Sequence, residues 1–309
     1  MGRKTRLPAE QRAILWSIFE QVRKKLLSRN LVTYPQFFKL LTGIVSGNTN
    51  PVFDFVVVDE AQDLGIPHLR FFAALAGSRP NGLFFSGDLG QRIFQQPFSW
   101  KALGVDVRGR SRTLRVNYRT SHQIRMQADR LLGPEVSDVD GNSDDRKGTI
   151  SVFNGPLPVV SVCRSSQEEI EVVGRWIAGL TSDGLVPHEF AIFVRSDAEL
   201  DRARSAANAA GLPFTVLDST VETRSGHVSI GTMHLAKGLE FRAIVAMACD
   251  DEVIPSQERV ESVTDDSELE EVYNTERHLL YVACTRARDY LLVTAITPGS
   301  EFLQDLIEA

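Results

Sequence analysis

Short apolar runs and helical segments alternate along most of this 309-residue chain, and this alternation restricts the fold more than any other feature. Strands that alternate with amphipathic helices are typical of βαβ units, in which the strands are parallel and helices cover the sheet. The sequence predicts strands at 53–58, 83–85, 150–153, 159–163, 190–194, 214–217, 228–231, 243–248 and 290–295. It predicts helices at 7–29, 34–42, 67–76, 166–180, 197–211 and 269–288. We therefore expect an α/β fold with parallel sheets flanked by helices.

Two adjacent carboxylates follow the first apolar run. Residues 53–58 are aromatic or β-branched except for Asp54, which predicts a buried central strand, and Asp59 and Glu60 come directly after it. Ligands bind at the carboxyl ends of strands in such sheets. Asp59 would hold Mg²⁺ through a hard oxygen contact, and Glu60 would position or deprotonate the water that attacks a γ-phosphate. The alternative is an acidic turn that caps the next helix.

Charge is unevenly distributed along the chain, whose net charge is −6. Residues 1–30 and 101–130 each carry eight Lys or Arg against two acids, which suits a phosphate backbone, although a solvated surface is the alternative. Residues 250–276 carry eleven acids against Arg259 alone, so we expect a solvated loop or a face that binds a protein partner.

Other features of the sequence favour an intracellular protein. The three cysteines lie far apart, which favours reduced thiols over disulfides or a zinc site. No apolar run reaches the roughly 18 residues of a membrane helix, and we expect a cytoplasmic location. The polar, Gly-rich segment 133–148 is expected to be a mobile loop.

The sequence Asp59-Glu60-Ala61-Gln62-Asp63 resembles motif II of superfamily 1 helicases of the UvrD/Rep/PcrA type. Four further segments resemble later motifs of that family in the correct order: 87–94 (motif III), 114–121 (IV), 230–241 (V) and 276–288 (VI). The resemblance implies a RecA-like P-loop NTPase architecture that uses ATP and Mg²⁺. The order of the motifs carries this identification more than any single one.

The resemblance also implies roles at the nucleotide. The implied catalytic residues are Asp59, also the metal ligand, and Glu60, Gln91, Arg119 and Arg286. Gln91 would sense the γ-phosphate, Arg119 would contact it, and Arg286 would act as an arginine finger. A helix-terminal arginine bonded to the last carbonyls is the alternative for Arg286. The implied cofactor-binding residues are Tyr118, Gly238 and Glu240.

The implied DNA-binding residues are Phe94, Trp100, Thr232 and His234. Aromatic rings stack on any base, which suits a motor that tracks any sequence. A core aromatic is the alternative for Trp100. Arg195, in a weaker match at 190–196, is a further candidate contact.

The domain expectation has two parts. No segment matches the phosphate-binding loop GxxxxGK[ST], and Gly2-Arg3-Lys4-Thr5 is only superficially similar. We interpret 1–110 as a partial helicase domain 1A and 111–309 as a RecA-like domain 2A, an incomplete first domain and a complete second. About thirty residues separate Ser196 from Val228, so no large 2B insertion is expected.

The resulting hypothesis is the carboxy-terminal part of an ATP-dependent DNA helicase or translocase, with 3′-to-5′ movement implied by the family. The isolated chain is expected to be inactive as an ATPase. The expected partners are single-stranded DNA or a single/double-strand junction and the amino-terminal P-loop region. The alternatives are a naturally truncated, noncatalytic DNA-binding or regulatory relative, and a module of a nuclease–helicase.

Overall fold

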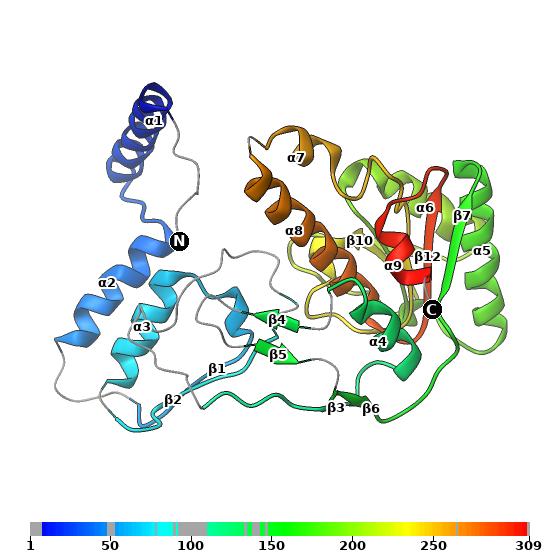
Figure 1. The fold of residues 1–309 in the computed structure, drawn as a ribbon, viewed down its shortest axis with the longest axis horizontal. Coiled ribbons are helices and arrows are strands. Elements are labelled where there is room, and N and C mark those ends of the chain that lie inside the picture. The colour runs from blue at the N-terminus through cyan, green and yellow to red at the C-terminus, as the bar shows by residue number, and fades with distance from the viewer. Residues whose placement is uncertain are drawn as a thin grey trace. The chain divides into compact units, whose positions relative to one another are not determined.

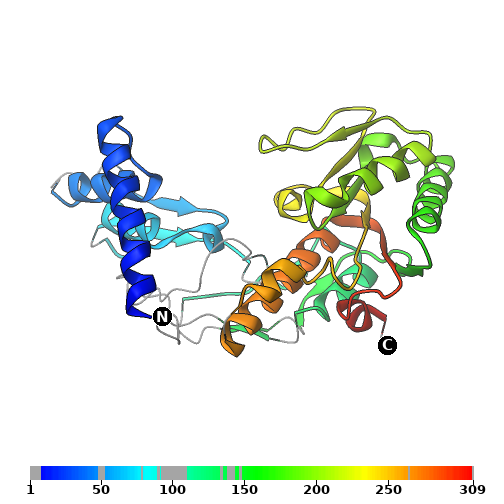
Figure 2. The same ribbon diagram turned by 90° about the horizontal axis from the view of Figure 1, so that it is seen from above.

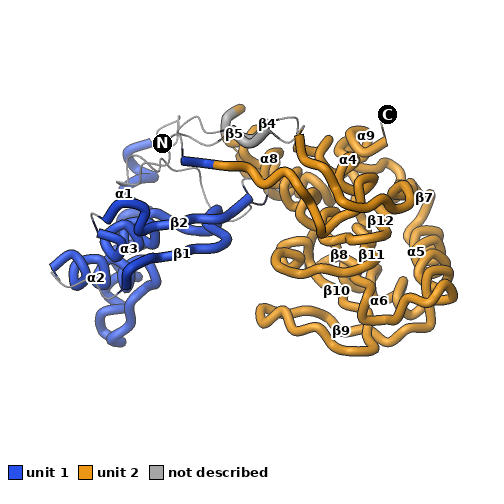
Figure 3. Tube along the Cα trace, turned by 90° about the horizontal axis from the view of Figure 1, so that it is seen from below, with its two compact units in different colours: residues 1–111, 137–142 blue, residues 112–136, 143–309 orange. Residues whose placement is uncertain are grey.

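The structure is a computed structural model that describes residues 8–47, 53–77, 79–88, 91, 110–132, 135–137, 143–145, 148–263 and 265–307. The chain divides into two compact units (Figure 3). Unit 1 comprises residues 1–111 and 137–142, and unit 2 comprises 112–136 and 143–309. No helix in the described ranges combines the length and the apolar character that crossing a bilayer requires.

Unit 1 contains three helices and a small parallel sheet in its described part. The helices are α1 (Ala9–Ser28), α2 (Tyr34–Ser46) and α3 (Ile66–Ala76), and strand β1 (Val56–Val58) pairs with β2 (Leu83–Phe85). Thr33 begins α2 with a capping box, because its hydroxyl accepts from the Gln36 N–H while the Gln36 side chain accepts from the Thr33 N–H. Helix α2 packs on α3, with the Phe38 ring edge-on to Phe71.

The prediction that residues 53–58 form a buried central strand was wrong. The strand covers only Val56–Val58, and Val58 alone is buried. Phe55 and Val57 are 71% and 72% exposed, and Phe84, the register partner of Val57, is exposed as well. Helix α3 contacts both strands. An apolar run predicts a strand, but burial of both faces needs elements on both sides of the sheet.

Helix α1 forms where the apolar periodicity predicted it, but none of its residues is buried. Figure 2 shows it as the dark blue helix that crosses the paler blue elements of unit 1 in that view. The amphipathic pattern is therefore present in unit 1 without a described core beneath it.

Unit 2 is built on a six-stranded sheet in the order β7-β12-β11-β8-β10-β9, in which every neighbouring pair is parallel (Figure 1). The strands are β7 (Val159–Cys163), β8 (Phe190–Val194), β9 (Phe214–Val216), β10 (Val228–Thr232), β11 (Phe241–Ala246) and β12 (Ala287–Ile296). The predicted α/β class, with a parallel sheet flanked by helices, is confirmed.

Helices cover both faces of this sheet. Helices α5 (Ser166–Ser182) and α6 (Leu200–Ala209) pack together on the face that carries Phe190, Ile192 and Val194. The alternate residues of β8 are also fully buried, while α4 (His122–Asp129) contacts β12 and α8 (Asp266–Cys284) contacts β11 and β12. Every residue of β8 is therefore buried, as a central parallel strand requires.

Smaller elements complete the described parts of the chain. They are α7 (Gln257–Glu261), α9 (Phe302–Ile307), the paired strands β3 (Val116–Asn117) and β6 (Ile150–Ser151), and the 3₁₀ turns η1 (Ala61–Asp63), η5 (Pro187–Glu189), η6 (Asp197–Glu199) and η7 (Met233–Ala236). The segment 133–148, expected to be only a loop, also contributes the paired strands β4 (Glu135–Ser137) and β5 (Ser143–Asp145).

Candidate functional site

In unit 1, Asp59 lies at the carboxyl end of β1, beside the end of β2. Its Oδ1 accepts hydrogen bonds from the Ser86 hydroxyl and from the Glu60 N–H, the latter at 2.9 Å. These two bonds, the one from Ser86 first, lower the pKa of Asp59. The side chain is exposed and ionised at neutral pH, so it offers one hard oxygen ligand of the type that Mg²⁺ accepts. Among the described residues, no group of three or more His, Cys, Asp or Glu side chains is placed to hold a metal ion.

Gln62 joins the ends of the two strands, a role that motif matching did not predict. Its buried amide donates to the Glu60 carboxylate, and its Oε1 accepts from the Asp88 N–H at 3.0 Å. A Cβ at Gly87 would lie 2.3 Å from that Oε1, so any larger residue there would displace the Gln62 side chain. Gln62 lies within the motif II sequence, but the resemblance assigned it no role.

Gln91 is drawn into the same network. Its side-chain amide donates to Asp88 Oδ2 at 2.9 Å, and its N–H donates to the Asp88 carbonyl at 3.0 Å. Hydrogen bonds thus connect Glu60, Gln62, Asp88 and Gln91. The predicted stacking residues Phe94 and Trp100 lie outside the described residues.

In unit 2, the structure brings together two predicted nucleotide contacts. Arg119 Nε lies 3.1 Å from Glu240 Oε2, and each side chain is about half exposed. Asn117 orders the chain before Arg119, because its Oδ1 accepts from the Arg119 N–H at 2.8 Å. The Tyr118 ring is exposed. The Arg119–Glu240 pair and the Tyr118 ring are therefore accessible to solvent on unit 2.

The predicted motif V residues lie at the carboxyl end of strand β10 and just after it. Thr232 ends the strand, and His234 lies in the turn η7; both are partly buried. Burial lowers the pKa of His234, and the Arg195 guanidinium lowers it further. Gly238 has φ +81°, a conformation that favours glycine, and it precedes Glu240 by two residues.

Arg286 is 1% exposed. Its Nε donates to the Val282 carbonyl at 3.1 Å, and its Nη2 donates to Thr285 Oγ1 at 3.4 Å. These contacts are those of a helix-terminal arginine, the alternative considered from the sequence. The role of Arg286 at a phosphate stays a prediction.

Arg195, a candidate DNA contact, is buried and forms an ion pair. Its guanidinium makes two hydrogen bonds to the fully buried Glu276, at 2.5 and 2.6 Å. A second buried acid, Glu169, pairs with Arg202 and accepts from Thr294 Oγ1 at 2.7 Å. The sequence did not predict either network, because the partners are far apart in the chain.

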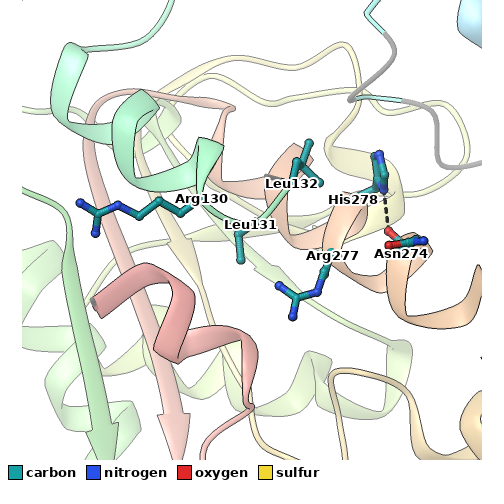
Figure 4. Close-up of a pocket in the computed structure, with 6 residues that line it drawn as sticks. All are labelled: Arg130, Leu131, Leu132, Asn274, Arg277 and His278. Carbon is teal, nitrogen blue, oxygen red and sulfur yellow. Dashed lines mark hydrogen bonds between the residues drawn. The ribbon is translucent and has the colours of Figure 1, made fainter. Parts of the chain in front are cut away.

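A pocket of about 330 Å³ lies elsewhere in unit 2 (Figure 4). It is lined by Arg130, Leu131, Leu132, Asn274, Arg277 and His278, and none of these is a predicted site residue. Arg277 pairs with Asp305 and lies over the Phe302 ring, while His278 Nδ1 is 2.5 Å from the Asn274 carbonyl.

Comparisons with known proteins point to one family. Residues 219–297 match the model of the UvrD-like helicase C-terminal domain. A protein described as a probable DNA helicase from Mycoplasma pneumoniae is 23% identical over 291 residues, which cover 89% of this chain and 51% of that protein. ATP-dependent DNA helicase PcrA from Staphylococcus epidermidis is 41% identical over 76 residues, which cover 25% of this chain and 10% of that protein. This chain thus spans about half the length of the first relative and about a tenth of the second.

One solved structure, described as the C-terminal domain of a possible DNA helicase from Lactobacillus plantarum, is 24% identical with a TM-score of 0.43. The alignment covers 62% of this chain and 94% of that chain. The resemblance predicted from the motifs is confirmed by the family match and the relatives: residues 219–297 match the model of the UvrD-like helicase C-terminal domain, and the chain is similar to DNA helicases.

Proposed function

We propose that this chain is part of an ATP-dependent DNA helicase or translocase and supplies nucleotide-contacting and strand-contacting residues to it. The similarity to DNA helicases supports the general assignment. In this proposal residues 1–110 belong to a helicase domain 1A and 111–309 form a domain 2A. Coupling of hydrolysis to 3′-to-5′ movement is part of the proposal.

The Arg119–Glu240 ion pair carries this proposal. Arg119 comes from the proposed motif IV, outside the matched segment, and Glu240 from the proposed motif V, inside it. Two residues that the resemblance assigns to the nucleotide thus meet across 121 positions of sequence. A phosphate would compete with Glu240 for Arg119, because guanidinium binds phosphate and carboxylate through the same paired donors.

The acidic end of β1 in unit 1 would bind Mg²⁺. Asp59 would contribute one ligand to Mg²⁺, whose other ligands would be water and phosphate oxygens. Gln62 holds the Glu60 carboxylate by a hydrogen bond, which suits a residue that orients a water molecule. Gln91 would sense the γ-phosphate directly.

Thr232 and His234 would contact single-stranded DNA, with Phe94 and Trp100 as stacking residues. Burial and Arg195 favour the neutral imidazole of His234, so we propose a hydrogen-bonding contact rather than a charged one. A cytoplasmic location, a role in DNA repair, and a protein partner for residues 250–276 complete the proposal.

Nucleotide binding is the first test. We expect the chain to bind a fluorescent ATP analogue with Mg²⁺, and Arg119→Ala to weaken binding on the order of tenfold. Arg175→Ala is the matched control, because Arg175 is exposed on α5 and its Nε donates to a backbone carbonyl, that of Glu171, at 3.3 Å. Both substitutions remove one positive charge. Equal affinities for the two variants would contradict the role of Arg119.

Hydrolysis tests the larger claim. We expect the chain alone to hydrolyse ATP at background rate. Adding a polypeptide that contains the GxxxxGK[ST] region of a UvrD-like relative should restore DNA-stimulated hydrolysis. Arg286→Ala should abolish the restored activity. Rapid hydrolysis by the chain alone would contradict this arrangement. DNA binding with no response to ATP would favour the noncatalytic DNA-binding alternative.

A further inference from the structure

A fully buried carboxylate connects three elements at the carboxyl end of the unit 2 sheet. Glu276 in α8 accepts two hydrogen bonds from Arg195, which follows β8, and one from Arg259 Nη1 in α7 at 2.7 Å. We name these three residues the Glu276 cluster. A buried carboxylate with this many charged donors is held in one position, and it holds both guanidiniums in turn.

The Glu276 cluster lies beside the proposed strand-contacting residues. Strands β8 and β10 are parallel neighbours with Val194 opposite Thr232, so Arg195 and the turn η7 leave the same edge of the sheet. Turn η7 also contacts α8. His234 is close enough for Arg195, Glu276 and Arg259 all to influence its pKa.

The Glu276 cluster has one carboxylate and two guanidiniums, so its formal charge is +1. Arg195 is buried and directs two nitrogens to Glu276, but the Arg259 side chain is 39% exposed and is bonded to Glu276 through Nη1. Gln257 and Glu261 lie two positions to either side of Arg259 and are hydrogen-bonded to each other on another face of α7. The excess positive charge therefore reaches solvent through Arg259.

We propose that Arg259 is a further contact to the phosphate backbone of single-stranded DNA, next to His234, and that Glu276 is its positioning residue. This inference rests on the proposed binding of DNA by Thr232 and His234. A phosphate contact by one arginine requires no particular base, as movement along any sequence demands.

Arg259 was not predicted from the sequence, because it is the only Lys or Arg in the acidic segment 250–276. Three of those acids have partners within unit 2. Asp250 pairs with Arg202 at 2.6 Å, Asp265 accepts from the Glu268 N–H at the start of α8, and Glu276 is buried. Glu258 and Glu261 remain exposed in α7 beside Arg259, so the surface at Arg259 carries both signs of charge.

The test compares Arg259→Ala with Arg204→Ala in the 309-residue chain. Arg204 is a close match, because its side chain is 40% exposed and also pairs with one carboxylate, Asp201, at 2.5 Å. Both variants change the net charge equally. The probe is a fluorescein-labelled oligothymidylate of about 16 nucleotides, titrated by anisotropy at several salt concentrations.

We expect Arg259→Ala to weaken binding on the order of fivefold at low salt and to reduce the slope of log K against log salt by about 0.7, the value for one phosphate contact to a single strand. Arg204→Ala should match the unmodified chain. Arg259→Lys should keep most of the slope, and Arg259→Gln, which retains a donor for Glu276, should lose it. Thermal melting of each variant separates loss of contact from loss of fold.

The outcomes distinguish this inference from the proposed function. If His234→Ala weakens binding while Arg259→Ala behaves like Arg204→Ala, the inference is wrong and the proposed function stands. If the unmodified chain does not bind the probe, both are wrong.

Discussion

Units 1 and 2 contain similar apolar strands but bury them differently. All five residues of β8 in unit 2 are buried, whereas Val58 is the only buried residue of β1 in unit 1. Both strands are parallel to their neighbours and rich in valine or phenylalanine. The difference lies in the covering elements, because helices lie over both faces at β8 while α3 contacts β1 and β2. Strand formation follows local sequence, and burial follows the number of layers.

The helices show the same contrast. Helix α1 exposes Trp16 and Phe19, while Trp176 in α5 packs against the unit 2 core. Unit 1 therefore has fewer buried apolar contacts among its described residues, and we expect its backbone amides to exchange faster than those of the unit 2 sheet.

The largest expected effect compares two phenylalanines. Phe193→Ala in β8 removes a fully buried ring that packs edge-on to Phe241, and it should reduce the free energy of unfolding by about 4 kcal/mol. Phe84→Ala in β2 removes an exposed ring and should cost less than about 0.5 kcal/mol. Urea unfolding measures both, and similar costs would break the comparison between the units.

The next effect compares two glutamates of α5. Glu169 is fully buried, bonds Thr294 and the Ala248 N–H, and pairs with Arg202, so Glu169→Gln should cost about 2 kcal/mol. Glu171→Gln is the matched control, because Glu171 is exposed on the same helix and its carboxylate accepts from the Gln167 amide at 2.8 Å. Thermal melting should separate the two variants, and equal melting temperatures would show that the buried ion pair contributes no more than the surface hydrogen bond.

Sequence periodicity predicted the elements of unit 2 well. It predicted the burial of the unit 1 elements poorly. The predicted strands 159–163 and 190–194 agree with the observed β7 and β8 at both ends. Buried parallel strands have continuous apolar sequences, so local pattern is sufficient to find them. The run 53–58 has the same pattern, and only the three-dimensional structure reveals that its outer face is uncovered.

The candidate site was predictable where ordered motifs identify its residues, and unpredictable where distant partners decide the geometry. Motif order identified Arg119 and Glu240, which form an ion pair in unit 2, and Gln91, which bonds Asp88 in unit 1. Glu276 meets Arg195 across 81 positions, a distance over which no local pattern applies. The buried position of Arg286 likewise follows from packing, which the motif does not encode.

The smallest expected effect comes from removing one helix cap in each unit, which compares the two units by the same chemical change. Thr33 in unit 1 and Ser165 in unit 2 each cap a helix by accepting from the N–H three residues later, at 3.4 and 3.2 Å. Substitution of either by alanine should cost about 1 kcal/mol, because the same backbone donor loses its partner. Helix α5 is fixed to the sheet by buried residues and should open only with the whole of unit 2, whereas α2 has none and should fray locally.

Hydrogen exchange measured by mass spectrometry distinguishes the two responses. In Thr33→Ala the amides of α2 should exchange faster while the unit 2 strands are unchanged, and in Ser165→Ala the slowest amides of unit 2 should exchange faster together. If α2 in Thr33→Ala keeps the exchange rates of the unmodified chain, unit 1 is more cooperative than its exposed helices indicate. The exchange rates in Thr33→Ala therefore show whether the described elements of unit 1 unfold separately or together, which burial alone does not show.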